Sequence, residues 1–118
     1  MQNTLDVGKT TVLGGTAGGY FVTRYLIMSH IYDYLAIWFK YIVASNTTIT
    51  VELYDSTDTL LESSTFALTT AASFTSSGIQ NISLASITSS GIYYFKIKSS
   101  VAIQVQNFCA ITSDTGVS

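Results

Sequence analysis

The sequence predicts an all-β fold: a two-sheet antiparallel β-sandwich, in the form of a jelly roll of about eight strands, preceded by an extended N-terminal arm. Short segments in which apolar and polar residues alternate recur between turn signals, and no segment shows the 3.6-residue period of a helix. Ser and Thr supply 33 of the 118 residues, and Thr favours strands. With 8 Tyr, 6 Phe and 1 Trp, the chain is too aromatic for a disordered protein.

The first 19 residues differ from the rest in having no clear periodicity. The first nine are polar, and residues 10–13 are expected to form a short edge strand. The glycine-rich residues 14–19 are not followed by Lys-Ser/Thr, so they do not form a phosphate-binding loop and are interpreted as a hinge. We therefore divide the chain into an arm and hinge over 1–19, a sandwich domain over 20–111 and a polar tail over 112–118.

The most apolar part of the chain, residues 20–44, is interrupted by charged residues and by His. The interrupting residues are Arg24, His30, Asp33 and Lys40. A membrane-spanning helix needs about 20 mostly apolar residues, and a Lys, Arg or Asp near its centre costs about 2.5–3.5 kcal/mol. The stretch is also rich in Tyr, Phe, Ile and Val, which favour strands. We therefore expect no membrane span, but two long strands with a break near Ser29 and His30.

The second of these strands, over residues 31–43, has two apolar faces. One face carries Ile31, Leu35, Ile37, Phe39 and Val43, and the other carries Tyr32, Tyr34, Trp38 and Lys40. A strand that is apolar on both faces is either sandwiched between layers or lies against another subunit. We therefore predict intersubunit contacts at Tyr32, Tyr34 and Trp38, together with Val12 and Leu13 of the arm.

A hairpin is predicted over residues 48–63. Apolar and polar residues alternate over 48–54, and residues 59–63 form the returning strand. The four residues from Asp55 to Asp58 are expected to form the turn, because Asp and Ser side chains hydrogen-bond to their own backbone. Two carboxylates alone are too few for a Ca²⁺ site, so Asp55 and Asp58 are expected to stabilise the turn instead.

Three further strands are expected in the second half of the chain, near residues 79–84, 92–98 and 101–106. Residues 69–77 are small and polar, and they are expected to form a long loop. The hairpin and the last two strands supply a predicted core from alternating positions. Its members are Ile49, Val51, Leu53, Tyr93, Phe95, Ile97, Ile103 and Val105.

The chain contains no recognisable catalytic, metal-binding or cofactor-binding pattern. His30 is the only His and Cys109 the only Cys, so the residues for a catalytic triad or a closed zinc site are not present together. We expect His30 to occupy a bend or an interface and Cys109 to be a buried structural thiol. The net charge of −2 provides no basic surface for nucleic acid. The protein is therefore predicted not to be an enzyme, with no cofactor and no nucleic-acid partner.

Residues 48–106 contain two segments that combine a strand pattern with a turn residue. They are Ile-Thr-Val-Glu-Leu-Tyr-Asp at 49–55 and Gly-Ile-Tyr-Tyr-Phe-Lys-Ile at 91–97. They resemble the strands of single jelly-roll virion structural proteins, such as capsid and decoration proteins. They also resemble small β-sandwich domains attached to secreted enzymes. The resemblance covers half of the chain and supports the fold more than the family. It implies a subunit that acts by self-assembly.

The favoured hypothesis is a virion structural protein, a capsid, decoration or turret subunit, whose partners are copies of itself and other virion proteins. The first six residues are polar and acidic, so we expect no secretory signal and assembly of the virion inside the host cell.

Two alternatives remain open. The first is a carbohydrate-binding or adhesin module, in which Trp38, Tyr32 and Tyr34 stack on sugars; a glycan is the less favoured partner. The second is a pilin-like filament subunit, because residues 14–19 precede an apolar stretch. Arg24 inside that stretch, and the lack of a Glu early in it, speak against the pilin hypothesis.

Overall fold

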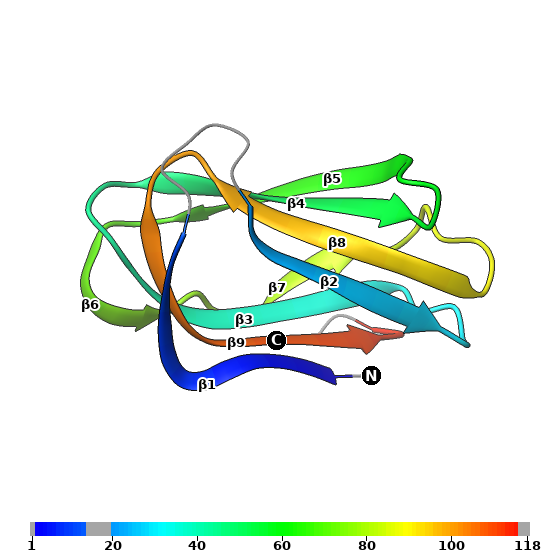
Figure 1. Cartoon of the computed structure of the whole chain (residues 1–118), viewed down its shortest axis with the longest axis horizontal. Helices are drawn as coiled ribbons and strands as arrows, with labels where there is room; N and C mark the ends of the chain where they lie inside the picture. The colour runs from blue at the N-terminus through cyan, green and yellow to red at the C-terminus, as the bar shows by residue number, and fades with distance from the viewer. Residues whose placement is uncertain (1, 14–19, 116–118) are drawn as a thin grey trace.

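The computed structural model describes residues 2–13 and 20–115, with side chains from residue 23 onward. Within these residues the protein is all-β, without a helix, and its strands form two antiparallel sheets (Figure 1). The predicted two-sheet antiparallel β-sandwich is therefore confirmed. The strands are β1 (Gln2–Leu13), β2 (Tyr20–Met28), β3 (Tyr34–Val43), β4 (Thr47–Asp55), β5 (Leu60–Leu68), β6 (Ala71–Ser76), β7 (Gln80–Ser83), β8 (Gly91–Ser99) and β9 (Ile103–Ser113).

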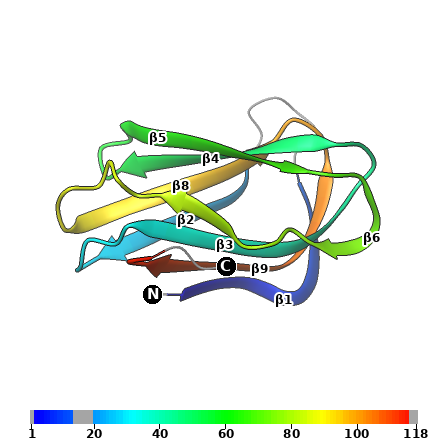
Figure 2. The ribbon, with the colours of Figure 1, turned by 180° about the vertical axis from the view of Figure 1, so that it is seen from behind.

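Each sheet combines strands that are distant in the sequence. One sheet has the order β1-β9-β3, with β6 and β7 following one another along the free edge of β3, and the other has the order β2-β8-β4-β5. Seen from behind, β6 and β7 border β3 while β4 and β5 lie in the opposite layer (Figure 2). Because β6 and β7 share one edge, the described strands fill eight positions, in agreement with the predicted number.

The strand pairs are nested around the turn between β4 and β5. From the inside outward, β4 pairs with β5, β3 with β6 and β7, β2 with β8, and β1 with β9, all antiparallel. The pairs β3-β9 and β4-β8 then join these nested pairs into two sheets. The chain thus resembles one long hairpin whose arms have rolled into a sandwich.

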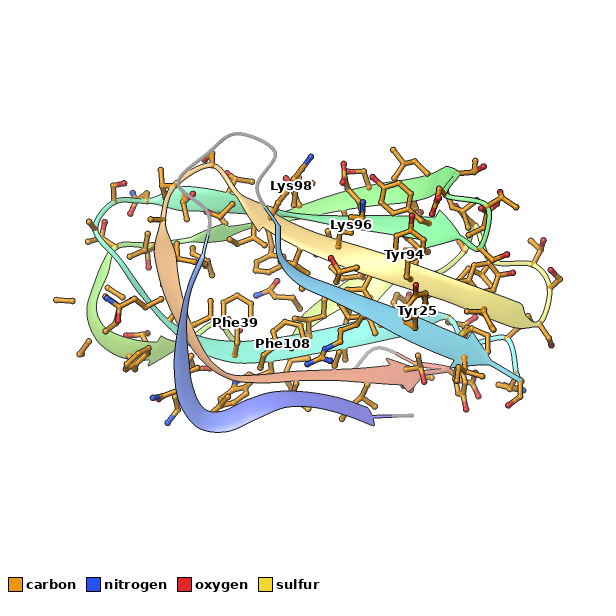
Figure 3. All side chains as sticks on the ribbon, in the orientation of Figure 1. Tyr25, Phe39, Tyr94, Lys96, Lys98 and Phe108 are labelled. Atoms are coloured by element: carbon orange, nitrogen blue, oxygen red, sulfur yellow. The ribbon has the colours of Figure 1, made fainter. Side chains whose placement is uncertain are left out.

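The core lies between the two sheets and is rich in aromatic rings. Phe39 on β3 stacks on Phe108 of β9, with ring centroids 6.1 Å apart, and lies 6.2 Å from Phe66 on β5. Figure 3 shows Phe39 and Phe108 between the two layers. All the core residues predicted from alternation are buried, and none is more than 8% exposed. The registers of β4, β8 and the first half of β9 are therefore confirmed.

The hairpin turn between β4 and β5 is organised by one carboxylate. Asp55 Oδ1 accepts hydrogen bonds from the Thr57 backbone N–H at 2.8 Å, the Thr57 hydroxyl at 2.7 Å and the Thr59 backbone N–H at 3.0 Å. Asp58 adopts the left-handed backbone region, with φ of 68°, which Asp tolerates better than most residues. The predicted turn is confirmed, and β5 extends further than expected, to Leu68.

The stretch 69–77, which was expected to be a long loop, instead contains strand β6. Its small polar residues carry no strand signal of their own, but Ser76 pairs with Lys40 and Thr75 with Tyr41 on β3. Pairing with the exposed edge of β3 thus outweighs local preference. Gly78, with φ of 70°, separates β6 from β7 in a conformation that glycine adopts without strain.

Strand β9 contains a bulge at Asn107, whose φ is 57°. The register with β3 shifts between the pairs Trp38–Cys109 and Lys40–Gln106. A bulge adds one residue to a strand, so the inward side changes from odd to even positions. As a result Phe108 is buried, whereas Cys109 is only half-buried and does not join the core as predicted.

Residues 2–13 are extended, as expected for the arm, but they belong to the sandwich. The backbone of β1 pairs with β9 from Gln2, opposite Ile111, to Leu13, opposite Ile103, so the edge strand is much longer than predicted. At the other end, β9 continues past the expected boundary at residue 111 and Thr112 is buried. The predicted hinge, residues 14–19, and the end of the tail lie outside the described residues.

The predicted break between the first two apolar strands is present, and it moves the chain from one sheet to the other. β2 ends at Met28 in one sheet, and β3 begins at Tyr34 in the opposite sheet. Alternation therefore does not continue through the connection. Ile31 is 37% exposed and Tyr32 packs against the core, the reverse of the prediction. In the part of the chain that the structure describes, no helix could cross a membrane.

Candidate interaction surface

The outer face of the β2-β8-β4-β5 sheet carries a row of three tyrosines. Tyr94 on β8 pairs with Tyr25 on β2 and with Tyr54 on β4. The rings of Tyr94 and Tyr54 are almost parallel, with centroids 5.0 Å apart, and Tyr25 meets Tyr94 edge-on at 5.9 Å. Their neighbours Leu26 and Phe95 point into the core, so the row lies on the solvent side of the sheet (Figure 3).

Hydrogen bonds to carboxylates hold the two inner tyrosines of the row. The Tyr94 hydroxyl donates to Asp58 Oδ1 at 2.6 Å, and the Tyr54 hydroxyl donates to Glu52 Oε1 at 2.9 Å. The bond to Asp58, with a contribution from burial, raises the pKa of Tyr94 to about 12, because the carboxylate favours the protonated phenol. Tyr25 is 68% exposed and forms the open end of the row.

Two lysines follow the tyrosine row along β8. Lys96 Nζ lies 4.9 Å from the centre of the Tyr54 ring and 5.7 Å from that of Tyr94, within the range of a cation–π interaction. Lys98 Nζ lies 3.0 Å from Glu52 Oε2. Glu52 also pairs with Lys96 across the strands, so this end of the face carries two lysines and a carboxylate, whereas Asp55 and Asp58 lie at its other end, in the β4-β5 turn.

Exposed aliphatic side chains surround the tyrosine row. Ile27 on β2 pairs with Ile92 on β8, and the two residues are 65% and 53% exposed. Leu60, opposite Tyr54 on β5, is 49% exposed. A cluster of large exposed apolar side chains is unusual on an isolated soluble protein. We call these exposed residues, together with the half-buried Tyr54 and the buried Tyr94, the tyrosine face; it consists of Tyr25, Ile27, Tyr54, Leu60, Ile92 and Tyr94.

The aromatic residues that the sequence suggested as contacts lie on a different surface. Tyr34 and Trp38 are on the outer face of the β1-β9-β3 sheet, as the alternation of β3 predicted. Trp38 is half-buried, and its indole Nε1 donates to Ser76 Oγ at 2.8 Å. Tyr32 packs against the core and does not share this face. The structure therefore brings Tyr34 and Trp38 to one surface and separates Tyr32 from them.

The arm residues among the predicted contacts are placed only by their backbone. Val12 pairs with Gln104 and Leu13 with Ile103, so both lie along the outer edge of β9. Their side chains are outside the described residues. Contact of Val12 and Leu13 with another subunit thus stays a prediction.

The one His and the one Cys of the chain are not part of the tyrosine face. His30 is exposed in the connection between β2 and β3, and its Nε2 lies 3.2 Å from Asp114 Oδ1. Cys109 on β9 lies opposite Trp38 on β3, in the sheet that does not carry the tyrosine face. Among the described residues, no three His, Cys, Asp or Glu side chains gather where they could hold a metal ion.

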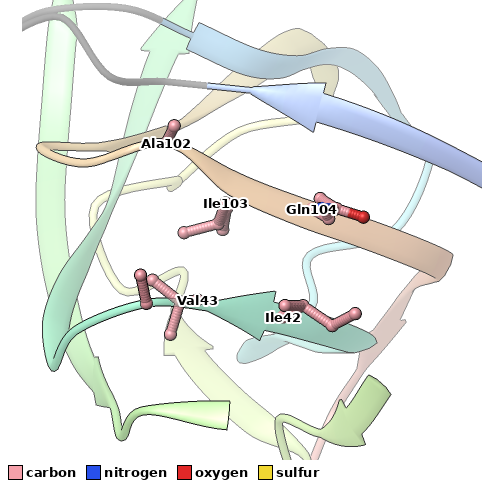
Figure 4. Close-up of a pocket in the computed structure, with 6 residues that line it drawn as sticks. Ile42, Val43, Ala102, Ile103 and Gln104 are labelled. Atoms are coloured by element: carbon pink, nitrogen blue, oxygen red, sulfur yellow. The ribbon is translucent and has the colours of Figure 1, made fainter. Parts of the chain in front are cut away.

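A shallow pocket opens between the end of β3 and the start of β9 (Figure 4). Its volume is about 190 Å³, and its lining is apolar apart from one amide. The lining residues are Ile42, Val43, Ala44, Ala102, Ile103 and Gln104. It contains no titratable group that could act as acid, base or nucleophile, so this pocket offers no chemistry.

The tyrosine face was not predicted from the sequence, because the two apolar faces of residues 31–43 indicated the second apolar surface there. The alternation that places apolar residues on the outer face is nevertheless visible in two segments of the sequence. In β2, Tyr25 and Ile27 alternate with Leu26 and Met28, so one apolar pair must face outward. The Ile92-Tyr94 pair alternates in the same way with the core residues of β8. What the sequence does not show is that these two strands are neighbours, which places the four residues together.

Comparison of the chain with protein-family models, with curated proteins and with solved structures finds no match in any of the three.

Proposed function

We propose that this protein is a non-enzymatic structural subunit of a virion, a capsid, decoration or turret protein, assembled inside the host cell. Its partners are copies of itself and other virion proteins. The observation that carries the proposal is the tyrosine face, where Tyr25, Ile27 and Ile92 are each more than half exposed. Only 10% of the residues are charged, against about 25% in typical domains, so little charge opposes association.

The nested strand pairing supports a jelly-roll interpretation of the sandwich. A jelly roll has eight strands in two sheets and contains two Greek keys, and it is common in viral capsids and in lectin domains. The orders β1-β9-β3-β6/β7 and β2-β8-β4-β5 are those expected when a long hairpin of four strand pairs rolls up. Because one fold serves many functions, the exposed surface and not the fold is the main support for assembly.

The proposal is tested by the native mass of the purified full chain. Sedimentation equilibrium over a micromolar to millimolar range is expected to show oligomers that grow with protein concentration, and electron microscopy would show their form. A monodisperse monomer at the highest concentration would contradict a function in self-assembly.

A second candidate function is glycan binding, and the same surface supports it. Tyr25 presents a largely exposed ring beside Tyr94, with the carboxylate of Asp58 and the ammonium of Lys96 close to the row. Binding to a panel of immobilised glycans tests this function. Loss of binding in Tyr25→Ala, with Trp38→Ala unaffected, would support a sugar site on the tyrosine face. The reverse result would support the site suggested by the sequence.

A further inference from the structure

We propose that the outer edge of β5 binds the outer edge of β2 in a second copy of this chain, so that the β2-β8-β4-β5 sheet continues from one copy into the next. The inference rests on the proposed function in assembly, and it names the two surfaces that meet. Strand addition is a recurring mode of recognition, because an edge strand presents backbone donors and acceptors that have no partner within its own sheet.

The two edge strands of this sheet have equal lengths and opposite directions. β2 and β5 each contain nine residues, and they form the two ends of the layer β2-β8-β4-β5 (Figure 1). The chain reverses direction at each of the antiparallel pairs between them, so β2 and β5 run in opposite directions. A copy that is moved sideways along the sheet, without being turned over, therefore presents its β2 to β5 as an antiparallel partner.

Each of these edges carries one charged residue on the inward side of the sheet, and the two charges are opposite. Arg24 on β2 pairs with the buried Phe95, and Glu62 on β5 pairs with the buried Leu53. Phe95 and Leu53 pair with each other, so Arg24 and Glu62 are the two ends of one row across the sheet. In the sideways arrangement, Arg24 of one copy therefore lies directly opposite Glu62 of its neighbour.

This contact supplies the partner that Glu62 lacks in the single chain. Glu62 Oε2 is shielded from solvent and has no hydrogen-bond partner among the described residues. Residues directly opposite each other on neighbouring antiparallel strands have Cβ atoms about 4.5–5.5 Å apart, so the guanidinium of Arg24 can reach this carboxylate and donate charge-assisted hydrogen bonds to it. A pair of two β2 edges or two β5 edges would bury these charges without an opposite partner. The charges thus select β5 with β2.

The rows on either side of the charges also match across the contact, and both lie on the outer face. Tyr25 and Leu60, the ends of the tyrosine row, are 68% and 49% exposed, and the contact places one against the other. Thr23 and Ser63 are exposed and end the next row, where they meet as two hydroxyl groups. An apolar contact, an ion pair and a polar pair therefore follow one another along the joined strands.

Because the contact joins two different surfaces, it leaves one edge free at each end of any assembly. The free β5 of the last copy binds the β2 of a further copy in the same way. Contacts of this heterologous type produce closed rings or helical filaments. Since neighbouring strands are rotated against each other by the twist of the sheet, each added copy is also rotated relative to the one before.

Charge reversal tests the contact in the full chain. Arg24→Glu gives both edges an acidic residue, and Glu62→Arg gives both edges a basic residue. Each variant alone is expected to self-associate at least about tenfold more weakly than the wild type in sedimentation equilibrium. An equimolar mixture of the two should assemble like the wild type, because every edge then meets the opposite charge on the other variant. Lys40→Glu, a charge reversal on the outer face of the other sheet, is the control and should leave assembly unchanged.

A change without charge provides a second test at the outer row. Leu60→Thr removes an exposed apolar side chain from the contact while keeping a residue that favours strands. Ile92→Thr is the matched control, because Ile92 is 53% exposed on the same sheet but lies on β8, away from both edges. We expect Leu60→Thr to weaken association and Ile92→Thr to leave it unchanged. A larger effect of Ile92→Thr would place the contact on the face of the sheet and overturn the edge contact.

The outcomes separate this inference from the proposed function. If each charge variant assembles alone as well as the wild type, the edge contact is wrong and self-assembly stands. The same conclusion holds if the mixture fails to assemble although both variants unfold at the wild-type temperature. If a charge variant is less stable to heat, the comparison of Leu60→Thr with Ile92→Thr decides. A wild-type chain that stays monomeric would overturn both the contact and the function.

Discussion

At the scale of single residues, short hydrogen bonds to two carboxylates fix the β4-β5 turn and one tyrosine ring. Asp55 organises the β4-β5 turn through three hydrogen bonds, which lower its pKa below the usual value because they favour the charged form. Asp58 accepts from Tyr94, the central ring of the tyrosine face. The turn and the row of rings are therefore connected by one contact.

The hydrogen bond between Tyr94 and Asp58 leads us to expect a change in stability at alkaline pH. The folded-state pKa of Tyr94, about 12, is above the unfolded value of 10. The hydrogen bond from Tyr94 to Asp58 therefore contributes fully to the free energy of unfolding below pH 10. This contribution is lost as pH rises from 10 to about 12. Denaturant unfolding across this range is expected to show a steeper fall in unfolding free energy for the wild type than for Tyr94→Phe.

Tyr34→Phe provides the matched control, since it removes an exposed tyrosine from the other sheet. It should retain the wild-type slope between pH 10 and pH 12. If Tyr94→Phe and Tyr34→Phe have equal slopes, the bond between Tyr94 and Asp58 does not contribute to stability.

At the scale of the elements, edge strand β5 contains a feature that lowers stability. Glu62 is half-buried on the inward side, and its Oε2 is shielded from solvent without a hydrogen-bond partner. Such a group costs about 1–3 kcal/mol. Its position on the edge gives a reason for that cost, because a charge there opposes the addition of another strand.

We expect Glu62→Leu to raise the free energy of unfolding by about 1–3 kcal/mol, since the unsatisfied oxygen is replaced by apolar packing. The same variant should aggregate more readily, because the edge of β5 loses its charge. Urea unfolding and light scattering measure the two effects, with Glu62→Gln as the control that keeps a polar group of equal size. A decrease in stability for the Leu variant would show that the carboxylate has a stabilising partner.

At the scale of the whole molecule, the outermost nested pair joins the two ends of the described chain. β1 covers the outer edge of β9, and β9 continues into the centre of its sheet beside β3. Residues 2–13 are thus part of the sandwich as well as candidates for contact with another subunit. The two roles predict different consequences when the segment is removed.

Deletion of residues 1–13 is expected to lower the free energy of unfolding, because β9 then loses the antiparallel partner along its outer edge. The backbone groups of β9 that become unpaired are also expected to promote aggregation. Thermal and denaturant unfolding of the truncated chain, compared with the full chain, provide the measurement. Unchanged stability combined with weaker assembly would instead support the original expectation of an arm held by a neighbouring subunit.

The amino-acid sequence alone was sufficient for the fold class and for the core residues of β4, β8 and the first half of β9. Strict alternation in 48–54 and 92–98, together with the Asp55 turn, predicted side-chain orientations that the structure confirms. Such predictions depend only on the two-residue period of a strand and on bonds within a turn. Both are local properties, so no information about distant parts of the chain is needed.

Pairing between distant strands decided the features that the sequence did not predict. β6 forms because the edge of β3 is available, and the bulge at Asn107 reverses the inward side of β9. The tyrosine face exists because β2 and β8, more than sixty residues apart in sequence, pair in the register that brings Tyr25 to Tyr94. A side chain's own residue type and near neighbours determine whether it favours a strand. Which strands become neighbours is determined by the packing of the whole sandwich, and with it the surface that the protein presents to a partner.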